Sequence, residues 1–119
     1  MYCAVFIAGG GFYGSKAVEA LRGRGLVVVA DVSRSCSARR YVDCVVDDLD
    51  EIDVERCSAV LVLGDAAEVL LKIIEKGFVP EIIVPTVPRH LAGDFIALYL
   101  RRKGFEVSPS SAGLDAVVE

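Results

Sequence analysis

The stretch that decides the fold lies near the start of the chain and reads Gly9-Gly10-Gly11-Phe12-Tyr13-Gly14-Ser15-Lys16. It stands between an apolar run, residues 3–8, and an amphipathic segment, residues 17–24, so it predicts a strand, a glycine turn and a helix. Three of its glycines match the pattern G-x-G-x-x-G: Gly9, Gly11 and Gly14. In that pattern the first glycine permits a sharp turn, the second lets backbone approach a pyrophosphate, and the third lets helix and strand pack closely. The stretch therefore predicts a dinucleotide site whose phosphates lie at the N-terminus of the helix.

An acidic residue stands at the distance that such a site requires. The apolar run at 26–30 predicts a second buried strand, and Asp31, 20 positions after Gly11, closes it. An acid at this place binds the ribose 2′-hydroxyl, although a strand-end Asp can instead cap the next turn. Arg34 could accommodate a 2′-phosphate, but Asp31 would repel one, so we expect NAD rather than NADP. The residues expected to contact the cofactor are Gly9, Gly11, Phe12, Tyr13, Gly14, Asp31, Val32, Arg34 and Gly64.

Further apolar runs predict four more strands, at 41–46, 58–63, 81–84 and 105–107. Helical patterns lie between them: a short one at 33–40, one from Asp65 to Gly77, and one at 88–103. Alternating strands and helices predict one α/β domain over 1–119, a three-layer, doubly wound parallel sheet in the order 3-2-1-4-5-6. The segment 47–57 holds six carboxylates. We interpret it as a solvated turn or short helix rather than a metal site, because metal ligands must converge.

Composition narrows the class of protein. Hydrophobic residues make up 54% of the chain, which suits a parallel sheet buried on both faces. The net charge of -4 argues against nucleic acid as a partner. No apolar run reaches the roughly 18 residues of a membrane span, and no leader precedes the first strand, so we expect a cytoplasmic protein. The chain lacks Asn and Gln, which indicates a thermophilic source.

The four cysteines, Cys3, Cys36, Cys44 and Cys57, show no C-x-x-C pair and no metal-ligand spacing. We expect reduced, mostly buried thiols. A disulfide among Cys36, Cys44 and Cys57 is the alternative, since proteins of hyperthermophiles can carry disulfides inside the cell.

The residues from Gly9 to Gly14, the strand that ends at Asp31 and the later strand–helix units resemble the NAD-binding Rossmann domains of the TrkA N-terminal and saccharopine dehydrogenase type. The likeness spans roughly residues 3–107, and its specific motif lies within the first 31. It implies a Rossmann fold in which Gly9, Gly11, Gly14 and Asp31 contact NAD. A looser similarity to precorrin-2 dehydrogenases rests on the three glycines and Lys16. No part of the chain matches the catalytic portions of the larger relatives.

Three functions are compatible with these residues. The first is an NAD(H)-binding module that acts as a sensor, regulator or subunit. The second is a small oxidoreductase completed at a dimer interface, in which Arg89 or His90, the only histidine, would contact an anionic substrate. The third is a methyltransferase-like protein that binds S-adenosylmethionine. The 88–103 segment is apolar around much of its circumference, which favours a homodimer through that helix.

Overall fold

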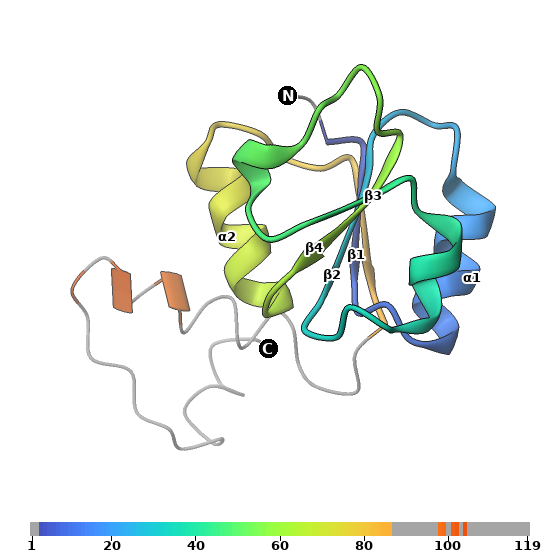
Figure 1. Cartoon of the computed structure of the whole chain (residues 1–119). Coiled ribbons are helices and arrows are strands. Elements are labelled where there is room, and N and C mark those ends of the chain that lie inside the picture. Colours follow the sequence, from blue (N-terminus) through green and yellow to red (C-terminus); the bar gives the residue numbers. More distant parts are fainter. Residues whose placement is uncertain (1–2, 87–97, 100, 103, 105–119) are drawn as a thin grey trace.

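The computed structural model describes residues 3–86, 98–99, 101–102 and 104 of the 119-residue chain. A five-stranded, all-parallel sheet forms the centre, and α1 and α2 cover its opposite faces (Figure 1). The predicted α/β class and the parallel sheet are therefore confirmed. In chain order the elements are β1 (Val5–Ala8), α1 (Phe12–Leu21), β2 (Val27–Asp31), the 3₁₀ helix η1 (Ser37–Tyr41), β3 (Cys44–Val46), the 3₁₀ helix η2 (Leu49–Glu51), β4 (Ala59–Leu63), α2 (Ala66–Glu75) and β5 (Ile82–Pro85).

The inner strands form where the sequence is continuously apolar. Every residue of β1 is buried, as are the first four of β2 and of β4. Alternate side chains of each strand enter an apolar cluster on one face or the other. The cluster under α1 includes Val5, Ile7, Val18, Val29 and Leu61. The cluster under α2 includes Phe6, Val28, Val60, Leu70 and Ile73.

The strand order is β3-β4-β2-β1-β5, so the predicted order 3-2-1-4-5-6 is wrong. β4 rather than β3 pairs with β2, in register from Val27 opposite Ala59 to Asp31 opposite Leu63. An inner position needs a strand that is apolar on both faces, and the five residues of β4 provide it. β3 has only three residues, two of them partly exposed, and forms the edge beyond β4. The predicted sixth strand at 105–107 lies outside the described residues.

β1 lies between two strands that the chain reaches through helices on opposite faces of the sheet. α1 leads from β1 to β2 on one face of the sheet, whereas α2 leads from β4 to β5 on the other face. β1 is therefore flanked by β2 and by β5, and the chain switches direction beside it. Ligands of open parallel sheets bind at such a switch point, at the carboxyl ends of the strands.

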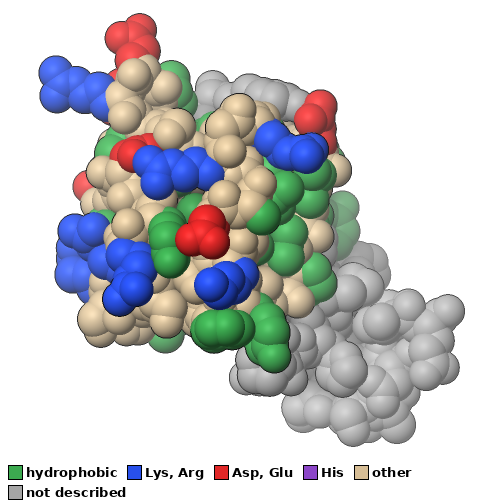
Figure 2. Space-filling view, turned by 90° about the vertical axis from the view of Figure 1, so that its right-hand side faces the viewer, with side chains coloured by type: hydrophobic (Ala, Val, Ile, Leu, Met, Phe, Trp, Pro, Cys, Tyr) green, Lys and Arg blue, Asp and Glu red, His purple; other side chains and the backbone are tan. Residues whose placement is uncertain are grey.

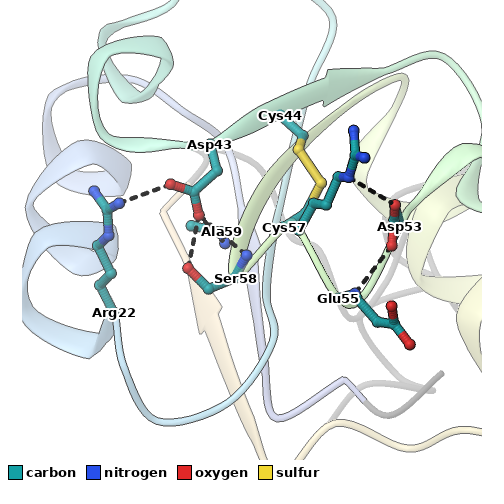
Figure 3. Close-up of a disulfide and its surroundings, with 9 residues drawn as sticks. Arg22, Asp43, Cys44, Asp53, Glu55, Cys57, Ser58 and Ala59 are labelled. Atoms are coloured by element: carbon teal, nitrogen blue, oxygen red, sulfur yellow. Dashed lines mark hydrogen bonds and ion pairs between the residues drawn. A yellow bond between two sulfur atoms is a disulfide. The ribbon is translucent and has the colours of Figure 1, made fainter.

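A disulfide joins Cys44 of β3 to Cys57, which lies just before β4, with the two Cα atoms 5.9 Å apart (Figure 3). Cys3 and Cys36 are free thiols. The prediction of four reduced thiols is therefore wrong for Cys44 and Cys57, and the alternative of a disulfide is correct. The two residues are 13 positions apart in sequence, and the pairing of β3 with β4 brings them together.

The remaining elements differ from the predictions mainly in their boundaries. α1 begins inside the glycine motif, at Phe12, and the helix predicted at 33–40 is the 3₁₀ helix η1. The acidic segment 47–57 contains the short helix η2, as predicted. Gly77 follows α2 with φ of 93°, the left-handed conformation of a C-terminal glycine. Among the described residues, no helix has the length and apolar character to cross a membrane.

Candidate functional site

The glycine turn, residues 9–14, lies at the carboxyl edge of the sheet, where it connects β1 to α1. Because all strands are parallel, the residues that follow β2, β4 and β5 reach the same edge. Asp31, Gly64 and Thr86 are the residues at those three strand ends. The turn and these strand ends together form the candidate site.

Backbone conformation or close packing favours glycine at three positions of the turn. Gly9 has φ of 105°, a conformation that other residues rarely adopt. A Cβ on Gly14 would lie 1.8 Å from the carbonyl oxygen of Gly9, so only glycine allows this approach of helix to strand. A Cβ on Gly10 would lie 2.7 Å from Sγ of Cys36. The sharp turn predicted at Gly9 and the close packing predicted at Gly14 are therefore confirmed, and Gly10 has a constraint that the motif does not include.

Gly11 differs from its neighbours, because nothing in the described structure requires a glycine there. Its φ is -73°, and a Cβ at this position would meet no atom within 4 Å. Gly11 is the N-cap of α1, and no side chain caps the helix. The N–H groups of residues 11–14 make no hydrogen bond to the described residues, and the first turn contains no acid. This helix terminus therefore presents unpaired donors and the positive end of the helix dipole.

Asp31 joins the end of β2 to the glycine turn. Its Oδ2 accepts a hydrogen bond from the N–H of Gly10 at 2.8 Å, and its Oδ1 accepts one from the N–H of Ser33 at 2.8 Å. The second bond caps the following turn, which was the alternative interpretation of this residue. A carboxylate has about four acceptor positions, so the two bonds do not exhaust it. A ribose contact by Asp31 stays a prediction.

Two residues that hold the turn were missed by sequence reasoning. Oγ1 of Thr86 lies 2.7 Å from the carbonyl oxygen of Ala8 and 2.9 Å from that of Gly9, and donates to them. The N–H of Ala38 donates to the carbonyl of Gly10 at 2.8 Å. The only sequence signal for Thr86 was a hydroxyl residue directly after a strand that ends at the ligand edge. Ala38 contributes only its backbone, which no sequence pattern could indicate.

Large apolar side chains are exposed beside the turn. Phe12 is 64% exposed, Tyr13 73% and Val32 78%. The rings of Phe12 and Tyr13 meet edge to face with centroids 5.3 Å apart, and Nζ of Lys16 lies 5.6 Å from the Phe12 centroid. These contacts leave most of both rings in solvent, on the same helix terminus as the unpaired N–H groups.

The remaining predicted site residues are less closely associated with the turn. The N–H of Gly64 donates to the backbone carbonyl of Asp31 at 3.0 Å, which joins the end of β4 to that of β2. Arg34 is exposed, and its guanidinium lies 3.8 Å from Oδ1 of Asp47. Arg89 and His90 lie outside the described residues.

The free thiols do not have the character of nucleophiles. Burial, and then the neighbouring Asp31 carboxylate, raise the pKa of the Cys36 thiol. Burial raises the pKa of Cys3 to about 11. Both groups are therefore protonated near neutral pH, whereas a reactive cysteine needs the thiolate.

A separate pocket of about 120 Å³ lies at the carboxyl ends of β3 and β4, beside α2. Its polar lining is mostly acidic and includes Asp47, Asp48, Asp65 and Glu68, with Lys72 as a cation. Within the described part of the chain, no group of three or more His, Cys, Asp or Glu is arranged to hold a metal. Of the predicted site residues that the structure describes, only Gly64 lines this pocket.

Charge is distributed unevenly between the stretch that contains α1 and η1 and the stretch that contains η2 and α2. Residues 12–42, which include α1 and η1, hold six Lys or Arg and two Asp or Glu. Residues 43–76, which include η2 and α2, hold three Lys or Arg and ten Asp or Glu. Figure 2 shows Lys and Arg side chains spread across the α1 side. Basic residues therefore predominate in residues 12–42 and acidic residues in residues 43–76, although Arg22 pairs with Asp43 and Arg34 lies near Asp47.

Comparison with known proteins identifies a family without a described activity. The family described as "Uncharacterized protein, N-terminal domain" matches residues 5–91, which include all five strands, the glycine turn and Thr86. A protein of Archaeoglobus fulgidus, described as "Uncharacterized protein", is 34% identical over 114 residues, which is 94% of this chain and 48% of that protein. The chain thus spans about half the length of this relative. No solved structure matches. Because the family match covers most of the chain, the protein belongs to the family of these N-terminal domains.

Proposed function

We propose that the protein is a Rossmann-type module that binds NAD(H) at the glycine turn and acts as a sensor, regulator or subunit. Gly11 carries the proposal. Each of the other glycines in the turn has a reason inside the fold, whereas a side chain at Gly11 would point into open space. A ligand that approaches the backbone here supplies the missing reason, and a pyrophosphate makes such an approach in dinucleotide sites.

The chemistry around Gly11 suits a phosphate. The unpaired N–H groups of residues 11–14 are donors, and the dipole of α1 favours an anion at this end. α1 has neither a capping side chain nor an acid in its first turn, so in the described part of the chain no side chain occupies these donors. Lys16, one turn into the helix, adds a positive charge near the same end.

The neighbouring strand end suits a nucleoside. Asp31 retains acceptor positions for ribose hydroxyls, and the exposed Val32 beside it offers an apolar surface to a base. The Asp31 carboxylate disfavours a 2′-phosphate, and Arg34 lies close to Asp47, so NAD is preferred over NADP. The switch of chain direction beside β1 agrees with a Rossmann arrangement at this edge.

Binding rather than catalysis is proposed because the described residues offer no suitable acid, base or nucleophile at the turn. Asp31 is engaged by backbone N–H groups, and Cys36 is a protonated thiol. The oxidoreductase alternative depends on Arg89 and His90, and the homodimer on the 88–103 helix. Arg89, His90 and most of that helix lie outside the described residues, and these alternatives stay predictions.

Calorimetric titration of NADH, NAD⁺, NADP⁺ and S-adenosylmethionine into the full chain tests the proposal. We expect NADH and NAD⁺ to bind, and Gly11→Ala to weaken NADH at least about tenfold, because its methyl group would occupy the phosphate position. The same change should reduce the free energy of unfolding by less than about 1 kcal/mol. Asp31→Ala is a poorer probe, since it also removes the acceptor of the Gly10 N–H.

Asp65→Ala is the matched control, because Asp65 caps α2 through a hydrogen bond from the N–H of Glu68. Its loss should cost about 1 kcal/mol of stability and leave the Kd for NADH unchanged. A wild-type protein that binds none of the four ligands would refute the proposal. Unaltered NADH binding by Gly11→Ala would place the ligand elsewhere.

A further inference from the structure

One peptide group in the glycine turn is hydrogen-bonded through both its carbonyl and its N–H, to residues at the ends of two different strands. The carbonyl oxygen of Gly9 accepts a hydrogen bond from Oγ1 of Thr86 at 2.9 Å. The N–H of Gly10, which belongs to the same peptide group, donates to Oδ2 of Asp31 at 2.8 Å. Thr86 follows β5 and Asp31 ends β2, and these two strands flank β1. The Gly9–Gly10 peptide therefore spans the switch point of the sheet.

This peptide would rotate easily without those partners. It lies between two glycines, which tolerate backbone conformations that other residues avoid. Rotation would turn the Gly9 carbonyl toward the Asp31 carboxylate and the Gly10 N–H toward the Thr86 hydroxyl, so both hydrogen bonds would be lost. The carbonyl also lies against Gly14, whose hypothetical Cβ would be 1.8 Å away. The orientation of this one peptide thus affects how α1 begins.

The backbone of Thr86 is itself fixed by the sheet. Its N–H donates to the carbonyl of Ala8 at 3.0 Å, which continues the pairing of β5 with β1. Its hydroxyl lies 2.7 Å from that same carbonyl, so the single hydroxyl proton is shared between the oxygens of Ala8 and Gly9. The side chain is half-buried and also lies near Gly14, at 3.4 Å from the position of a Cβ there. A rigid donor of this kind can determine the conformation of the glycines it contacts.

We propose that Thr86 is a positioning residue that holds the glycine turn in its phosphate-binding conformation, so that the affinity of the turn is controlled from the β5 end of the sheet. This inference rests on the proposed function of the turn. Thr86 touches no ligand in this scheme. It acts through the Gly9–Gly10 peptide, and a partner or ligand that displaces the end of β5 would lower affinity without contacting the phosphates.

Thr86→Val and Thr86→Ser, made in the full chain, test the inference. Valine keeps the shape and removes the hydroxyl, whereas serine keeps the hydroxyl. Without ligand, hydrogen exchange of the Gly10 amide should accelerate about tenfold in Thr86→Val and stay within about twofold of wild type in Thr86→Ser. The Kd for NADH should follow the same order. Exchange of the Gly64 amide, which donates to the Asp31 backbone carbonyl, is the internal control and should not change.

Three results would overturn the inference: unchanged Gly10 exchange in Thr86→Val, equal effects of valine and serine, or faster exchange at Gly64 as well as at Gly10. The last would show general destabilisation. Thr86→Ala removes the same hydroxyl and replaces Thr86→Val if the latter does not fold. If wild-type protein binds no NADH, the proposed function fails, and the exchange measurements still decide whether Thr86 holds the turn.

Discussion

Two helices begin at the same edge of the sheet, but their N-termini are capped differently. The N-cap of α1 is Gly11, and this terminus has no capping side chain and no acid in its first turn. The N-cap of α2 is Asp65, whose side chain accepts the N–H of Glu68 at 3.2 Å, and Glu68 adds a second negative charge. Each helix follows a buried parallel strand, so the fold alone does not require the difference. The difference indicates that α2 carries its own anion and that α1 leaves the place of an anion open.

The same contrast extends to the two halves of the sheet. In the acidic half, β3, β4 and α2, short side chains satisfy the backbone: Asp48 accepts the N–H of Asp50, and Asp53 that of Glu55. The disulfide adds a covalent link between β3 and the start of β4. In the glycine half, β1, α1 and β2, Asp31 also accepts backbone N–H groups, but the start of α1 is shaped by close backbone contact and has no capping side chain. The first turn of α2 is therefore capped by a side chain of the protein, whereas the first turn of α1 keeps its donors available.

The largest effect is expected where backbone contact holds the glycine half. Gly14→Ala places a Cβ 1.8 Å from the Gly9 carbonyl oxygen, and a backbone atom cannot move aside as a side chain could. We expect a loss of at least about 3 kcal/mol in the free energy of unfolding, measured by urea denaturation. Gly11→Ala, three positions away with open space around it, is the control. Equal losses of stability in the two variants would show that packing constrains Gly14 no more than Gly11.

The second-largest loss of stability is expected in the acidic half. Replacing both Cys44 and Cys57 by Ser removes a cross-link between residues 13 positions apart, which should cost about 3 kcal/mol of stability. Because the link is remote from the glycine turn, the Kd for NADH should not change while the protein remains folded. A reducing agent should lower the thermal midpoint of the wild type and have no further effect on the double variant. A change in NADH affinity would show that the halves are coupled.

The smallest effect concerns acid stability. The hydroxyl of Ser58 is the largest cause that lowers the pKa of Asp43 below its ordinary value, and the N–H groups of Ala59 and Ser58 and the Arg22 guanidinium act in the same direction (Figure 3). A carboxyl whose pKa is lower in the folded state stabilises the protein above its unfolded pKa. That stabilisation is lost as the pH falls through the folded pKa, in the range below about pH 4.

Asp43→Asn should therefore give a shallower loss of stability below about pH 4, followed by urea midpoints over a pH series. The effect should be small, since Asp43 is partly exposed and solvent screens its charge. Ser58→Ala removes one of the donors and should change the profile in the same direction. If both variants had the same dependence of urea midpoint on pH as the wild type, this role of Asp43 would be contradicted.

The sequence predicts most of the sheet, because buried parallel strands are continuous apolar runs and helices between them follow a simple period. It does not predict the strand order. The run at 41–46 resembles the other strands in composition, but only Cys44–Val46 pairs, and only at the outer side of β4. Strand pairing depends on how much apolar surface each strand buries in the folded protein, and the pattern of apolar residues along the chain does not specify this.

The candidate site likewise contains residues that the sequence predicts and residues that it does not. Gly9, Gly14 and Asp31 can be predicted because their spacing within one strand–helix–strand unit follows a known motif. Thr86 is 77 positions from Gly9, and Cys36 contacts Gly10 through a segment that returns over the turn. Such contacts follow from tertiary packing, so no local motif contains them. The thermophilic source and the cytoplasmic location stay predictions.

The uneven distribution of charge has a consequence for how the molecule meets other charged bodies. The formal charge of -4 describes the whole chain, but interactions between exposed charges are largely screened beyond about 8 Å at physiological salt. Within that range the local balance of charge matters more: residues 12–42 carry an excess of Lys and Arg, and residues 43–76 an excess of Asp and Glu. A charged molecule that approaches the α1 side therefore meets a different local charge from one that approaches η2 and α2.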